Sequence, residues 1–161
     1  LGGPSVYPPI PAGANDVTQV RREWVTSTGG DRYRRALYTF FQRSAAHPAL
    51  LVFDAPDATV SCTRRVRSNT PLQALIALND EAAFEFAGAL AGRILKEAPE
   101  DDKKRLEHGW ILTMARQPSQ AEAERMMRLI RTRRDSNEDE PAVWTAVARV
   151  LLNIDEFLTR P

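Results

Sequence analysis

The stretch NTPLQALIALND, residues 69–80, marks the point at which the character of the chain changes. Within it, Thr70 occupies an N-cap position, Pro71 the first helical position and Gln73 the third. This arrangement is a capping box with the proline that helix N-termini favour. We therefore predict a helix from Pro71. The Thr70 side chain should accept a hydrogen bond from the Gln73 N–H, and the Gln73 side chain should accept one from the Thr70 N–H.

Helical patterns continue from this point to the end of the chain. Apolar residues recur at intervals of three and four in segments that begin near residues 81, 100, 119 and 141. A second capping box, Ser119 to Glu122, opens the helix at residue 119. The final segment, 141–158, is apolar over most of its circumference, so we expect it to be the central core helix. The predicted fold class is mainly α, a bundle of roughly five helices from Thr70 onward.

Each predicted helix turns one apolar face toward the core. In the helix after residue 81 this face carries Phe84, Ala87, Ala91, Ile94 and Leu95. In the next helix it carries Leu106, Trp110, Ile111 and Met114. The spacing of Gly88 and Gly92 predicts a place where another helix approaches closely.

Upstream of the helices, residues 1–67 show little regular pattern. The opening segment, 1–11, is rich in proline and glycine, which favours extended geometry. Residues 34–41 concentrate Leu, Tyr, Thr and Phe, so we expect a short strand there, with a helix as the alternative. The length predicts a single domain, residues 1–161, in which an irregular, basic segment (1–67) wraps a helical core (68–161).

Composition excludes several protein classes. The 161 residues are 43% apolar and 27% charged, which is ordinary for a globular domain and unlike a disordered chain. No apolar run approaches the roughly 20 residues of a membrane span. The single cysteine, Cys62, excludes an internal disulfide, a cysteine-based metal cluster and covalent haem attachment. We expect Cys62 to be a small buried side chain, the alternative being a thiolate activated by Arg64 and Arg65.

The net charge of +1 conceals an uneven distribution. Residues 1–67 carry nine arginines against five acidic residues, a net charge of +4, whereas residues 68–161 carry −3. The small total charge argues against nucleic acid as a partner. Arginine suits bidentate pairing with anions, so the first third is the predicted place for an acidic ligand or partner. The candidate binding residues are Arg34, Arg35, Arg64, Arg65 and Arg67.

A second group of candidate residues is polar: His47, Asp54, Asp57 and Asn69. A histidine and two carboxylates within eleven residues can act as general acid and base or bind one divalent cation. The competing interpretation is structural, with Asp54 in a turn and His47 as the cap of a loop. Because motifs for phosphate loops, dinucleotides, zinc proteases and nucleophile elbows do not occur, we predict no metal and no cofactor in this chain.

Several stretches, in order along the chain, resemble one family. They are GGPSV at residues 2–6, RRALYTF at 34–40, HPA at 47–49, FDAPD at 53–57, CTRR at 62–65, NTPLQAL at 69–75, LND at 78–80, and the ending from Trp144 to NIDEFL at 153–158. Together they resemble the C-terminal portion of a planctomycete-type, cytochrome-c-associated domain of unknown function.

The resemblance implies a periplasmic or otherwise extracytoplasmic location, with the signal on a preceding part of a longer multidomain protein. It also implies that haem belongs to a separate cytochrome domain, and that a sulfatase- or phosphatase-like protein is a partner. The basic first third makes a polysaccharide the other candidate partner. The family has no established catalytic residue. Two hypotheses follow. One is a non-catalytic binding or docking module for an anionic polysaccharide or a partner enzyme. The alternative is the C-terminal half of a carbohydrate-active hydrolase that uses His47 and Asp54.

Overall fold

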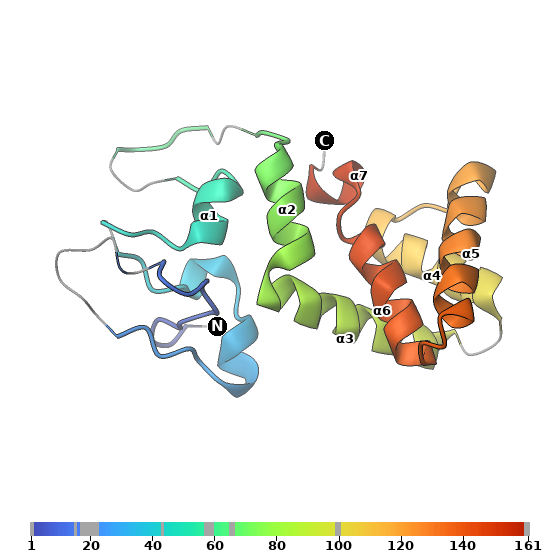
Figure 1. Cartoon of the computed structure of the whole chain (residues 1–161). Helices are drawn as coiled ribbons and strands as arrows, with labels where there is room; N and C mark the ends of the chain where they lie inside the picture. Colours follow the sequence, from blue (N-terminus) through green and yellow to red (C-terminus); the bar gives the residue numbers. More distant parts are fainter. Residues whose placement is uncertain are drawn as a thin grey trace. The chain divides into compact units, whose positions relative to one another are not determined.

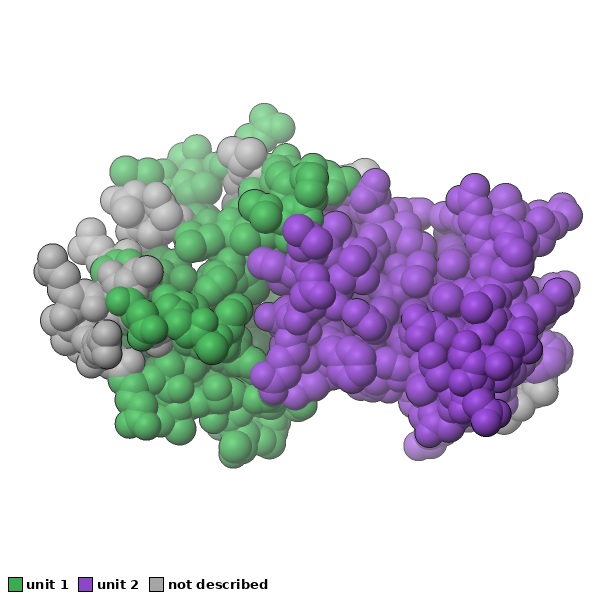
Figure 2. All heavy atoms as spheres, in the orientation of Figure 1, with its two compact units in different colours: residues 1–73 green, residues 74–161 purple. Residues whose placement is uncertain are grey.

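The computed structural model describes residues 2–14, 16, 23–42, 44–56, 60–64, 67–98 and 101–159. The chain forms two compact units, residues 1–73 and residues 74–161, which Figure 2 draws in green and purple. Helices dominate, and the described residues contain no strand. The prediction of a mainly α fold with an irregular N-terminal region is therefore confirmed.

In the described residues from Pro71 onward, five helices of nine or more residues follow one another (Figure 1). They are α2 (Pro71–Asn79), α3 (Glu81–Glu97), α4 (Asp102–Met114), α5 (Gln120–Asp135) and α6 (Glu140–Leu151), and a short α7 (Asp155–Leu158) ends the chain. Helix α6 packs against α3, α4 and α5, so the expected central helix is confirmed. The buried core consists of Ala87, Ala91, Ile94, Leu106, Trp110, Ile130, Val143, Trp144, Val147, Ala148 and Leu151.

Local capping explains where these helices begin. The side chains of Asp80, Asp101 and Asp139 each accept a hydrogen bond from a backbone N–H in the first turn of the helix that follows. Ser119 and Glu122 form the predicted capping box, with the Ser119 N–H 2.7 Å from Glu122 Oε2.

The end of the chain differs from the prediction, because α6 stops at Leu151 and a turn separates it from α7. Asn153 lies in this turn, and asparagine favours turns over helix interiors. Beyond the turn, Glu156 of α7 is held by Arg116, with Nη2 2.7 Å from Oε2. A tertiary ion pair thus fixes α7 separately from α6.

Three further predictions about packing are wrong. Phe84 and Ile111 are 55% and 47% exposed instead of buried. The Arg149 guanidinium is 5.5 Å from the centroid of the Phe84 ring. A Cβ atom on Gly88 or Gly92 would meet open space, so no helix approaches closely there.

The close approach occurs instead at Gly109 of α4. A Cβ atom at this position would lie 3.0 Å from Ile94 Cδ1 and 3.1 Å from Leu151 Cδ1. Glycine therefore allows α4 to pack tightly onto side chains of α3 and α6.

Among the described residues of unit 1 that precede α2, regular structure consists of two 3₁₀ turns, η1 (Gly29–Tyr33) and η2 (Ala36–Tyr38), and of α1 (Pro48–Val52). The predicted strand at 34–41 is wrong, since only one bridge forms there, between Val6 and Thr39. The backbone of Val6 makes both of its hydrogen bonds, which run to Tyr38 O and from the Phe40 N–H, each at 2.8 Å.

The same side chains that favoured a strand form a small aromatic cluster. Tyr7 stacks on Phe40 and meets Trp24 edge-on, with ring centroids 5.1 Å apart in both pairs. The Trp24 indole N–H donates to Pro8 O at 2.7 Å. Aromatic packing between distant segments, rather than sheet pairing, therefore holds this part of unit 1 together.

Candidate functional site

Asp54 is at the C-terminal end of α1 in a backbone conformation that usually belongs to glycine. Its φ is +57°, in the left-handed region. The Ala55 N–H donates to Leu50 O at 2.8 Å, and the Phe53 N–H donates to Ala49 O at 3.0 Å. The hydrogen bond from Ala55 is the one that closes a Schellman motif, with Asp54 at the position where glycine is most common.

The reason for aspartate at this position lies in its side chain. Oδ2 of Asp54 accepts the Ser68 N–H at 2.7 Å and the Ser68 hydroxyl at 2.8 Å. The Gln73 side chain completes the network, because its Nε2 donates to Val52 O at 2.9 Å and to Ser68 Oγ at 3.0 Å. We call Asp54, Ser68 and Gln73 the polar cluster.

Helix α2 supplies Gln73 to this cluster through the predicted capping box. The Gln73 N–H donates to Thr70 Oγ1 at 3.4 Å, and the Thr70 N–H donates to Gln73 Oε1 at 3.3 Å, so the box is confirmed. Gln73 is only 1% exposed, whereas its neighbour Leu72 is 62% exposed. The helix therefore turns the Gln73 side chain inward. There it bonds to Val52, which precedes Ser68 in the chain, and to Thr70, which follows it.

His47 is a helix cap. Its Nδ1 accepts the Ala49 N–H at 3.2 Å, which caps α1, and its Nε2 lies 2.9 Å from Pro9 O. Because Nδ1 is an acceptor, the ring proton is on Nε2 and donates to Pro9 O. The side chain is 9% exposed, and its ring centroid lies 6.0 Å from that of Trp24. Proton transfer through His47 would break a contact that holds two segments together.

Arg34 is committed to the N-terminal segment. Its guanidinium donates to the carbonyl oxygens of Gly2 and Pro4 and lies 3.7 Å above the Tyr38 ring centroid. The Gly2 N–H donates to Tyr38 Oη at 3.1 Å, and this bond, with the nearby Arg34 cation, lowers the pKa of Tyr38. Arg34 therefore contributes to the fold of unit 1.

The other candidate arginines that the structure describes, Arg35, Arg64 and Arg67, are exposed. Arg35 is the N-cap residue of η2, whereas Arg64 and Arg67 are in the segment that leads into α2. The side chains of Arg35 and Arg64 have no hydrogen-bond or ion-pair partner in the described part of the chain. Asn69 is exposed, and the remaining candidates, Asp57 and Arg65, lie outside the described residues.

Cys62 precedes these arginines and is exposed, so the prediction of a buried side chain is wrong. Its Sγ lies 3.4 Å from Arg64 O. Among the described residues, no group of three or more His, Cys, Asp or Glu side chains could hold a metal ion.

In unit 2, arginines near the helix ends are paired with acids. Arg134 forms ion pairs with Asp102 and Glu140, and this cation lowers the pKa of both carboxyls. Arg116 bridges Glu122 and Glu156, and its hydrogen bonds to Glu122 lower the pKa of that carboxyl to about 2. These cations stabilise contacts between helices rather than facing a ligand.

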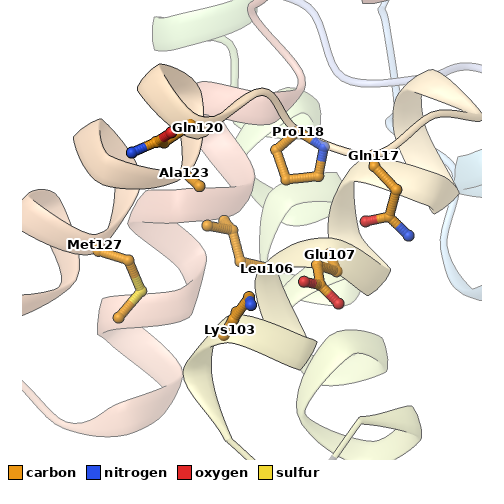
Figure 3. A pocket seen from close by; sticks show the side chains of 8 residues that line it. All are labelled: Lys103, Leu106, Glu107, Gln117, Pro118, Gln120, Ala123 and Met127. Atoms are coloured by element: carbon orange, nitrogen blue, oxygen red, sulfur yellow. The ribbon is translucent and has the colours of Figure 1, made fainter.

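Unit 2 also contains a cavity of about 460 Å³ between α4, the α4–α5 connection and the start of α5 (Figure 3). Its lining comprises Lys103, Leu106, Glu107, Gln117, Pro118, Gln120, Ala123 and Met127. Sequence reasoning did not find this site. Its residues come from three segments that only the packing of α4 against α5 brings together.

A protein-family model matches most of this chain. The model of the family PSD1, described as a protein of unknown function (DUF1553), matches residues 1–130. Neither the curated proteins nor the solved structures gave a significant match. The match includes the polar cluster, the candidate arginines and the cavity, while the resembling stretch from Trp144 to residue 158 lies beyond it.

The described part of the chain has no helix that is both long enough and apolar enough to span a membrane. The family match covers well over half of the chain. The chain therefore belongs to the PSD1 (DUF1553) family, a family of proteins of unknown function.

Proposed function

We propose that this chain is a non-catalytic binding module for an anionic ligand, and that the arginines just before Ser68 contact it. The observation that carries the proposal is the exposed Arg64 side chain, which has no acidic partner in the described part of a strongly basic segment. An exposed guanidinium without a partner retains all five donors for a carboxylate or sulfate.

The polar cluster supports the proposal by providing a fixed base. Ser68 follows Arg67 directly, and both its N–H and its hydroxyl bond to Asp54. Gln73 then bonds to Ser68 and to the end of α1. A segment held at its base loses less conformational entropy on binding than a free loop, so the cluster favours affinity without touching the ligand.

The exposed arginines of α5 do not offer an equal alternative. Arg125, Arg128 and Arg131 face outward, as expected from the helix pattern. Acidic residues, among them Glu124 and Asp135, alternate with them along the helix and lower the local potential. The α5 arginines therefore serve as a matched comparison for the arginines before Ser68.

The setting of this function follows the family resemblance. We infer a secreted or periplasmic planctomycete-type protein in which a separate cytochrome c domain carries the haem. Its ligand would be a sulfated or carboxylated polysaccharide, or an acidic surface of a sulfatase- or phosphatase-like partner enzyme.

The hydrolase alternative stays a prediction. It requires His47 and Asp54 to act on a substrate, yet His47 caps α1 and Asp54 accepts hydrogen bonds from Ser68. Both side chains hold the local backbone in place, and this favours the binding module over the enzyme.

The test measures binding to dextran sulfate and alginate, with neutral dextran as the control polymer, at low and at physiological salt. The double variant Arg64→Ser/Arg67→Ser should bind the charged polymers at least about tenfold more weakly. The matched variant Arg125→Ser/Arg128→Ser should bind like the parent chain. Binding should also weaken with added salt, because the arginines are exposed.

Equal losses in the two double variants would show that net charge alone drives binding, and would overturn the assignment to the arginines before Ser68. If the parent chain binds neither charged polymer, the polysaccharide proposal is wrong. Far-UV circular dichroism of each variant would verify that the helices remain folded.

A further inference from the structure

The cavity between α4 and α5 has an apolar floor and a polar edge. Leu106, which is 1% exposed, lies in the middle of the lining, and Ala123 and Met127 lie on one side of it (Figure 3). Glu107 and Gln117 are drawn on the other side. At about 460 Å³, the cavity falls within the range of small-molecule sites.

The side chains of the polar edge have no protein partner among the described residues, and Lys103 and Gln117 are exposed. Lys103 and Glu107 are four residues apart on α4 and line the same cavity, yet they do not form an ion pair. Neither these two side chains nor the Gln117 carboxamide has a hydrogen-bond partner within the described residues. Side chains at this spacing have Cβ atoms about 6 Å apart, so one small ligand can reach both charges.

The signs of these charges restrict the ligand. A simple anion in the cavity would be repelled by the Glu107 carboxylate. A simple cation there would be repelled by the Lys103 ammonium. A sugar would find no stacking surface, because none of the eight lining residues is aromatic. A molecule with a cationic group, an anionic group and an apolar portion matches all three parts of the lining.

We propose that this cavity binds a zwitterionic α-amino acid with an apolar side chain. The α-ammonium pairs with Glu107 and the α-carboxylate pairs with Lys103. The apolar side chain lies on Leu106 and Met127, where burial of its surface contributes affinity. Gln117 is available to donate to the carboxylate or accept from the ammonium. This site is in unit 2 and is independent of the binding function proposed for the arginines of unit 1.

The experiment is a titration of the ¹⁵N-labelled 161-residue chain, followed by ¹H–¹⁵N correlation spectra. L-Leucine should give saturable shifts in the amides of residues 103–107, 117 and 119–123. Three analogues test the recognition one group at a time. N-acetyl-L-leucine lacks the ammonium, L-leucinamide lacks the carboxylate, and glycine lacks the apolar side chain. Each should bind about tenfold more weakly than L-leucine or not measurably.

Two variants connect these losses to the residues. Glu107→Gln should remove the preference for L-leucine over N-acetyl-L-leucine, and Lys103→Met should remove the preference over L-leucinamide. Lys96→Met and Asp135→Asn change the same charges on exposed positions elsewhere and should leave both preferences intact. The spectra also report whether each variant is folded.

No saturable shift with L-leucine up to tens of millimolar would overturn the proposal. Equal binding of all four compounds would also overturn it, because the two charges would then not read the ligand. Shifts at the cavity with a neutral oligosaccharide and none with L-leucine would assign the site to another class of ligand.

Discussion

Substitution of Asp54 tests whether the polar cluster holds unit 1 together. The carboxylate accepts the Ser68 N–H at 2.7 Å and the Ser68 hydroxyl at 2.8 Å, with Gln73 Nε2 at 3.5 Å. A hydrogen bond to a charged acceptor contributes about 1.5–3 kcal/mol, and a donor left without a partner adds a penalty. Because Asp54 and Ser68 are only partly buried, we expect Asp54→Ala to lower the free energy of unfolding of unit 1 by about 2–4 kcal/mol.

The backbone conformation of Asp54 has a second effect on stability, which is opposite to that of the hydrogen bonds and can be measured separately. At φ +57° a residue with a Cβ is strained by about 1–2 kcal/mol, and glycine is not. Asp54→Gly should therefore be about 1 kcal/mol more stable than Asp54→Ala, although both lose the same hydrogen bonds. Asp54→Asn keeps one acceptor oxygen and tolerates the left-handed conformation, so it should be the least destabilised of the three.

The assay is urea unfolding followed by NMR, because it distinguishes the two units. The Trp24 indole N–H, which donates to Pro8 O, reports on unit 1, while far-UV circular dichroism reports mainly on the helices of unit 2. The order of stability should be parent, Asn, Gly and then Ala. An Ala variant within about 0.5 kcal/mol of the parent, or a Gly variant no more stable than Ala, would refute this reasoning.

The remaining predictions concern unit 2. Gly109→Ala should lower the free energy of unfolding by about 1–3 kcal/mol, because its Cβ would lie 3.0 Å from a side chain of α3. Gly92→Ala, in an open helical position, should raise it by about 0.5–1 kcal/mol, and thermal unfolding would measure both. Arg116 lowers the Glu122 pKa to about 2 from an ordinary value of 4.5, so this carboxylate stabilises the fold above pH 4.5 and loses its effect as pH falls toward 2. Glu122→Gln should therefore reduce stability at neutral pH and make the loss of stability between pH 4.5 and pH 2 less steep. Acid titration followed by circular dichroism would measure this loss. Equal losses in the parent and the variant would contradict the prediction.

Much of the candidate site could not be predicted from the sequence, because it depends on contacts between residues far apart in the chain. Asp54 and His47 were recognisable as polar residues beside turn signals. In the structure, Asp54 has a left-handed backbone conformation after α1, and His47 caps the start of that helix. Ser68, which accounts for the aspartate in a left-handed conformation, carried no signal of its own. The cavity of unit 2 was likewise invisible, because no local pattern reveals that Lys103 and Met127 line the same space.

The sequence by itself determined where the five long helices, α2 to α6, begin. The capping boxes at Thr70 and Ser119 and the three- and four-residue apolar spacing concern atoms within one or two turns, so local rules predict them correctly. Tertiary structure decided everything that depends on a partner far along the chain. It placed the close helix contact at Gly109 rather than at Gly88, and it packed Phe40 on Tyr7 instead of leaving it in a strand. The physical reason is that the packing energy depends on which surfaces meet. A sequence pattern shows which faces are apolar, but it does not show which faces pack against one another.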